Sequence, residues 1–159
     1  MMNQKGKSDE WYTPKYFFDD FDFIFDLDPC APDNKFSNVP CLNMYTKNDD
    51  GLSKEWFGSV WMNPPFGGRN GHFPWLEKFI KHGNGIGLMT SLTSSNGFQK
   101  FIPQMDRILF PSTKTKFINQ LGETPNTGQF NGIVLFSIGE KCNQVLDKSK
   151  LGIILRINQ

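Results

Sequence analysis

Short apolar runs, each closed by proline, glycine or acidic residues, recur along the chain and predict a series of buried strands. The most distinct run, 23–28, is rich in aromatic and β-branched residues and stops at Pro29. A second run, 60–62, leads directly into Asn63-Pro64-Pro65. The remaining predicted strands are 41–45, 86–89, 107–110, 114–118, 133–138 and 152–157.

Apolar residues at helical spacing predict helices between several of these strands. Thr13-Pro14 is typical of a helix start, with Thr13 as the N-cap and Pro14 at the first helical position. Aromatic residues then continue the pattern as far as Phe21. Further helices are expected over 74–81 and 97–105, and one or two helical turns over 51–56.

The order of these elements predicts an α/β fold with a mostly parallel sheet and an antiparallel edge. Residues 1–10 are polar and are expected to form a flexible tail, which leaves 11–159 as a single domain. Ligands of parallel sheets bind at the carboxyl ends of the strands. The loops that follow Asp28 and Met62 are therefore the places where we expect a functional site.

Composition narrows the class of protein. The chain has 159 residues, 38% of them hydrophobic, with 16 phenylalanines, which excludes an intrinsically disordered protein. No apolar run reaches the ~18 residues of a membrane span, and the first residues do not resemble a secretory signal. The three cysteines form no C-x-x-C pair, so we expect no disulfide framework and no metal site. These features favour a cytoplasmic protein.

The charge is almost balanced, with 17 basic and 16 acidic residues and a pI of about 7.7. A domain that depends on the phosphate backbone for affinity often has a pI above about 9. Strong non-specific binding to duplex nucleic acid is therefore not expected, although a local basic patch is compatible with this charge.

Asn63-Pro64-Pro65-Phe66 is the strongest chemical signal in the sequence. One interpretation is a rigid turn, because two prolines fix the backbone. The other is a binding site for an exocyclic amino group. An asparagine amide oxygen and carbonyls next to prolines present acceptors that no regular ladder uses, and Phe66 can stack on a planar base.

At this motif the sequence resembles the phage-type DNA N6-adenine methyltransferases, which are small enzymes that use S-adenosylmethionine. The resemblance covers almost the whole chain after the tail. The matching segments are Glu10-Trp11-Tyr12-Thr13-Pro14, Asp26-Leu27-Asp28-Pro29-Cys30-Ala31, Asp49-Asp50-Gly51-Leu52 and Trp61-Met62-Asn63-Pro64-Pro65-Phe66. It implies a Rossmann-like class I methyltransferase fold with helices on both faces of the sheet, a single domain without a separate target-recognition domain, and no metal.

The resemblance also implies roles for the residues of the second loop. Asn63 and the Pro64 carbonyl would accept hydrogen bonds from adenine N6, and Pro65 would keep the turn rigid. Phe66 would stack on a base flipped out of the helix, because the amino group is otherwise engaged in base pairing. Methyl transfer would then be a direct displacement that depends on positioning and fixed dipoles.

Three other segments are implied to bind the cofactor. They are Asp28-Pro29-Cys30-Ala31 around its methionine part, Tyr12-Thr13-Pro14 closing over the same end, and Asp49 or Asp50 at its adenine. The sequence does not decide between the two aspartates. The glycine-rich G-x-G of other methyltransferases is replaced by Pro32-Asp33-Asn34. No acidic residue stands where the ribose is expected, and Tyr45 and Asn48 are the nearest polar candidates.

DNA is the expected partner, and Arg69, Lys114 and Lys116 are candidate phosphate contacts. Two alternatives stay open at the level of sequence. One is a catalytically inactive nucleotide- or DNA-binding module on the same fold. The other is a methyltransferase that acts on cytosine N4 or on a glutamine side chain with the same type of pocket. The sequence leaves the oligomeric state open, and the resemblance places the protein in a bacterial host cell or a bacteriophage genome.

Overall fold

The computed structural model describes residues 11–33, 36–65, 71–124 and 132–158 of the chain, which form a sheet covered by helices. Its strands are β1 (Phe25–Asp28), β2 (Cys41–Met44), β3 (Val60–Met62), β4 (Gly85–Thr90), β5 (Arg107–Pro111), β6 (Ile133–Ile138) and β7 (Gly152–Arg156). Its helices are α1 (Lys15–Phe21), α2 (Phe73–His82), α3 (Asn96–Phe101), continued by a 3-10 turn η1 (Ile102–Gln104), and α4 (Glu140–Lys148).

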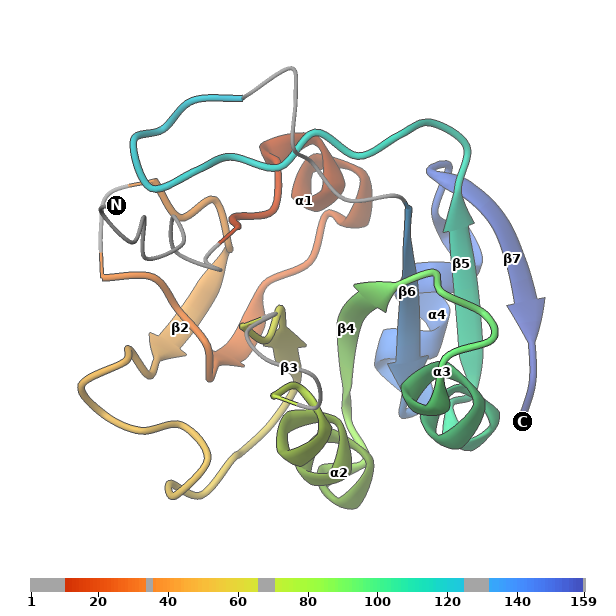
Figure 1. The fold of residues 1–159 in the computed structure, drawn as a ribbon, viewed down its shortest axis with the longest axis horizontal. Coiled ribbons are helices and arrows are strands. Elements are labelled where there is room, and N and C mark those ends of the chain that lie inside the picture. The colour runs from red at the N-terminus through yellow and green to blue at the C-terminus, as the bar shows by residue number, and fades with distance from the viewer. Residues whose placement is uncertain (1–10, 34–35, 66–70, 125–131, 159) are drawn as a thin grey trace, which may run out of the picture.

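The seven strands lie side by side in the order β2-β1-β3-β4-β6-β5-β7 (Figure 1). β1 pairs in parallel with β2 and β3, and β3 pairs in parallel with β4. β6 then runs antiparallel to β4 and β5, and β7 runs antiparallel to β5. This arrangement confirms the α/β fold with a parallel core and an antiparallel edge, and it is consistent with a class I methyltransferase fold.

Helices cover both faces of the sheet, as expected, and each face has its own hydrophobic core. Val60 and Met62 point into the core that α2 and α3 close. Trp61, between them in β3, points into the other core, which α1 and α4 close. Successive side chains of a strand face opposite sides of the sheet, so the apolar run 60–62 is buried on both faces.

The first helix begins one residue later than the sequence predicts. Pro14 has the extended dihedral angles φ −67° and ψ 148° and occupies the N-cap position, and no side chain caps the helix. The prediction that Thr13 is the N-cap is therefore wrong. The Thr13 hydroxyl instead contacts Asn63, 50 residues away.

Two further predictions are wrong for reasons that lie outside the local sequence. Residues 51–56 form turns rather than helix, because the Lys78 ammonium takes the carbonyls of Gly51, Leu52 and Lys54. Residues 114–118 alternate between exposed and buried side chains as a strand does. Among the described residues, however, they pair only through an isolated bridge between Tyr12 and Ile118.

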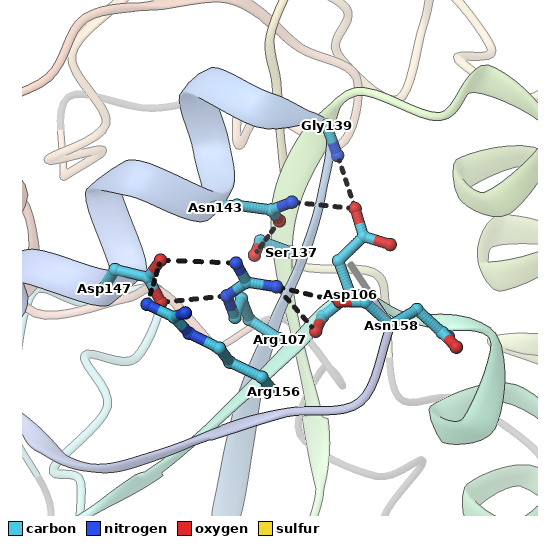
Figure 2. A network of polar contacts seen from close by, with 8 residues as sticks. All are labelled: Asp106, Arg107, Ser137, Gly139, Asn143, Asp147, Arg156 and Asn158. Atoms are coloured by element: carbon cyan, nitrogen blue, oxygen red, sulfur yellow. Dashed lines mark hydrogen bonds and ion pairs between the residues drawn. The ribbon is translucent and has the colours of Figure 1, made fainter.

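The sequence analysis does not predict helix α4, which packs a short apolar face of Cys142, Val145 and Leu146 against the sheet and adds polar contacts to it. Asn143 donates to the Asp106 carboxylate at 2.8 Å and accepts from the Ser137 hydroxyl at 2.8 Å, and both partners lie near the sheet (Figure 2). Asp147 accepts from Arg107 Nε at 2.8 Å. The network lies at the end of the sheet where strand β4 begins and strand β6 ends.

Candidate active site

A cavity of about 460 Å³ opens at the carboxyl ends of β1 and β3. The strand order changes direction at this point, because β2 follows on one side of β1 and β3 lies on the other. Such switch points are where α/β sheets bind ligands, and small-molecule sites typically enclose about 300–1,000 Å³. The cavity thus lies where the sequence analysis places the functional site, between the loops that follow Asp28 and Met62.

The loop after β1 forms one wall of the cavity, with Asp28, Pro29, Cys30 and Ala31 all lining it. Asp28 is 3% exposed, and its Oδ1 accepts the backbone N–H of Cys30 at 3.0 Å. Burial raises the pKa of the Asp28 carboxyl to about 7, and the Cys30 hydrogen bond opposes the rise. Burial without a cationic partner disfavours the ionised form of the carboxyl, and a cation bound beside it would stabilise that form.

The loop after β3 brings Asn63, Pro64 and Pro65 to the opposite wall. Asn63 Nδ2 donates to the Trp11 carbonyl at 2.7 Å and to the Thr13 hydroxyl at 3.2 Å. Asn63 Oδ1 is buried and has no hydrogen-bond partner among the described residues. Buried polar atoms are nearly always paired, so this acceptor is a candidate contact for a ligand that carries N–H groups.

Segment 11–13 forms the third wall, and two distant parts of the chain hold it there. Tyr12 and Ile118 exchange backbone hydrogen bonds of 2.8 and 3.0 Å. Asn38 Nδ2 donates to the Thr13 carbonyl at 3.2 Å. Tyr12 and Thr13 line the cavity, whereas Pro14 is buried at the start of α1 and is not part of its wall.

The structure separates the two aspartates that the sequence leaves equivalent. Asp50 lines the cavity and has a left-handed φ of 55°. Asp49 lies outside the cavity wall. Its carboxylate accepts hydrogen bonds from the Thr46 backbone N–H at 2.8 Å and from the Thr46 hydroxyl at 3.0 Å. These two hydrogen bonds lower the pKa of Asp49. Asp49 therefore stabilises the turn, and Asp50 is the one available to a ligand.

A close approach between two loops fixes the turn that carries Asp50. A Cβ atom on Gly51 would lie 2.1 Å from the Pro29 carbonyl oxygen, so only glycine allows this contact. Trp56 Nε1 donates to the Gly51 carbonyl at 2.8 Å. Lys78, on α2, donates to the Leu52 carbonyl at 2.7 Å and lies over the Trp56 ring, 5.2 Å from its centroid. Lys78 thus holds this wall from outside the cavity.

If the cavity binds S-adenosylmethionine, as the resemblance implies, replacing Lys78 by methionine should weaken that binding about tenfold while kcat at saturating S-adenosylmethionine changes less than threefold. Methionine keeps most of the apolar part of the side chain but has no ammonium to donate to the turn, and a hydrogen bond to a charged group contributes about 1.5–3 kcal/mol. Isothermal titration with S-adenosylhomocysteine measures the affinity. Lys81→Met, one turn further along α2, is the matched control, and equal affinities of the two variants would contradict the role of Lys78.

Several wall residues escape the sequence analysis. Trp11 and Trp75, to which the sequence analysis assigns no role, both line the cavity. Thr46 and Lys47 line it after β2, whereas the ribose candidates Tyr45 and Asn48 do not. The Tyr45 hydroxyl instead donates to the Glu55 carbonyl at 2.9 Å. Which residues of a loop face a cavity depends on tertiary contacts, and no spacing rule predicts it.

The remaining predicted residues lie apart from the cavity or outside the described part of the chain. Phe66 and Arg69 are outside the described residues. Lys114 and Lys116 are exposed and do not line the cavity, but their segment reaches the Tyr12 wall through Ile118.

Within the described residues there is no group of three histidine, cysteine or acidic side chains able to hold a metal ion. No described helix is long and apolar enough to cross a membrane.

A family model described as DNA N-6-adenine-methyltransferase (Dam) matches residues 2–149. Neither the curated proteins nor the solved structures include a match to the chain.

Proposed function

The chain belongs to the DNA N-6-adenine-methyltransferase (Dam) family, and we propose that the cavity between β1 and β3 is where cofactor and target adenine meet. Membership makes the protein an enzyme that methylates adenine N6 in DNA, and a methyltransferase of this family implies S-adenosylmethionine as the methyl donor. What remains to be assigned is which residues bind the cofactor, hold the adenine and contact the DNA.

The walls of the cavity fit the cofactor. When bound, S-adenosylmethionine supplies an electrophilic methyl group next to a positively charged sulfur. The buried Asp28 carboxyl offers a partner to the ammonium of the methionine part, and the turns at Cys30 and Ala31 shape this end. Asp50 offers an acceptor to the amino group of the cofactor adenine. Trp75 adds an apolar surface beside Gly51.

The unpaired Asn63 Oδ1 is the observation that carries the proposal. It would accept one N–H of adenine N6, and the Pro64 carbonyl would accept the other. Acceptors fixed at these places draw the nitrogen lone pair out of conjugation with the ring and aim it across the cavity. Rigid polar groups of this kind stabilise a transition state without reorganisation. The stacking role of Phe66 on the flipped base stays a prediction.

Transfer of labelled methyl from S-adenosylmethionine to unmethylated DNA, followed by nucleoside analysis, tests this function. The expected product is N6-methyladenine, and cofactor binding should be measurable in the same preparation by titration with S-adenosylhomocysteine. Label in N4-methylcytosine would contradict adenine as the target base. Absence of label in DNA, with or without cofactor binding, would contradict the proposed activity of the chain on its own.

Lys114 and Lys116 are proposed phosphate contacts, because their segment borders the Tyr12 wall through Ile118. The double variant Lys114→Gln/Lys116→Gln should weaken DNA binding and reduce the slope of log K against log salt by about 2, since each phosphate contact contributes about 0.9. Fluorescence anisotropy at several salt concentrations measures this slope. The same change at the exposed Lys141 and Lys148 of α4 is the control. Equal slopes for the two double variants would contradict the assignment.

A further inference from the structure

We infer that Thr13 is a positioning residue for the Asn63 amide, and that its hydroxyl therefore sets the rate of methyl transfer rather than the affinity for cofactor. The inference rests on the proposed function, which assigns adenine N6 to Asn63 Oδ1. It starts from the contact between Thr13 Oγ1 and Asn63 Nδ2, at 3.2 Å. Thr13 is 3% exposed, so water does not compete for this contact.

The contacts of Asn63 determine which way its amide faces. A backbone carbonyl only accepts hydrogen bonds, so the Trp11 carbonyl, 2.7 Å away, requires the nitrogen of the amide and not its oxygen. The nitrogen has a second proton, and the Thr13 hydroxyl accepts it. With both protons engaged, Oδ1 is left as an acceptor without a partner among the described residues. Rotating the amide by 180° would bring Oδ1 against the Trp11 carbonyl with no proton between the two oxygens.

Thr13 is itself held rigidly. Its carbonyl accepts from Asn38 Nδ2 at 3.2 Å, and the neighbouring Tyr12 is bonded to Ile118 in both directions. Pro14 follows with φ fixed at −67°. A β-branched side chain on such a backbone has few rotamers, which keeps Oγ1 in place. Because no side chain caps α1, the hydroxyl has no competing role at the start of that helix.

The pair of variants Thr13→Val and Thr13→Ser tests the inference. Valine has nearly the shape of threonine but accepts no hydrogen bond, whereas serine keeps the acceptor. We expect Thr13→Val to lower kcat about tenfold, with the KM for S-adenosylmethionine and the Kd of S-adenosylhomocysteine within twofold of the wild type. Thr13→Ser should restore kcat to within threefold. The effect corresponds to an unmade hydrogen bond on a buried donor.

Three results would overturn the inference. The first is an unchanged kcat in Thr13→Val. The second is a loss of S-adenosylhomocysteine affinity at unchanged kcat, which would make Thr13 a cofactor contact. The third is a Thr13→Ser variant as slow as Thr13→Val, which would attribute the loss to packing.

A second comparison keeps the test decisive if Thr13→Val does not fold. Thr13→Ser and Thr13→Ala differ only by the hydroxyl, so the ratio of their kcat values isolates the hydrogen bond, and a ratio near one would refute its role. Failure of the proposed function is seen separately, because a wild-type protein that transfers no methyl to adenine has no kcat to compare.

Discussion

The Asn63→Ala variant should lose methyl transfer almost completely, with kcat about 1,000-fold below that of the wild type, because removal of one preorganised hydrogen-bonding group costs roughly 10²–10³ in rate. Alanine removes the unpaired Oδ1 acceptor, and it also removes the donors to Trp11 and Thr13 that tie the β3 loop to segment 11–13. The cofactor contacts assigned to Asp28 and Asp50 are left intact. Single-turnover transfer of labelled methyl to DNA measures the loss.

Cofactor affinity separates this result from a general loss of structure. The Kd of S-adenosylhomocysteine should stay within about threefold of the wild type, since the proposed methionine end of the site lies on the β1 loop. Asn43→Ala is a control of the same chemical type, because Asn43 is exposed on β2 and its amide donates to the Asp26 carbonyl at 3.1 Å, away from the cavity. If Asn63→Ala retains more than a tenth of wild-type kcat, Oδ1 does not hold the adenine.

The sequence predicts the core of this site because its residues follow directly from short strands. β1 ends at Asp28 and β3 ends at Met62, and both run parallel, so the residues after them meet at one edge of the sheet. The hydrogen-bonding capacity of Asn63 and the rigidity of the two prolines after it follow from the sequence alone. In this part of the chain, local pattern and global fold give the same answer.

The parts that sequence analysis misses are made by contacts between distant segments. The residues next to Thr13 predict that it caps a helix, but its hydroxyl instead accepts a hydrogen bond from the Asn63 amide. Residues 51–56 look helical, but Lys78 takes the carbonyls that a helix would need. In each case a side chain far along the chain competes with the local hydrogen bond, and propensity contains no information about that competitor.

Asp28→Asn is expected to weaken S-adenosylhomocysteine binding about 10- to 100-fold, because a hydrogen bond to a charged group contributes about 1.5–3 kcal/mol and the amide has no charge to offer an ammonium. In the wild type the carboxyl must ionise to bind, so affinity should rise as the pH increases through about 7, the pKa of buried Asp28. The variant should lose this rise. Titration at pH 6 and pH 8 measures both effects, and a parallel pH dependence in the two proteins would contradict the role of Asp28.

The same carboxyl should make the protein without cofactor less stable as the pH rises. Its folded pKa of about 7 lies above the ordinary aspartate value of 3.8, so the folded state holds the proton more tightly than the unfolded state. The resulting stability is fully present below pH ~4 and is lost progressively as the pH rises to ~7. Between pH 5 and pH 8 the unfolding free energy of the wild type should fall by about 3 kcal/mol relative to Asp28→Asn, at 1.36 kcal/mol per pKa unit.

Urea unfolding of both proteins at the two pH values measures that difference, and saturating S-adenosylhomocysteine should reduce it, because an ammonium beside Asp28 favours the ionised form. A difference that does not change with pH would mean that the Asp28 carboxyl is not desolvated in the folded protein. A difference that changes with pH but not with ligand would separate burial from binding, and would place the ammonium elsewhere in the cavity. Under the proposed role, stability and function make opposite demands on Asp28: burial without a partner lowers the stability of the fold at neutral pH, and the same burial would favour a cationic ligand.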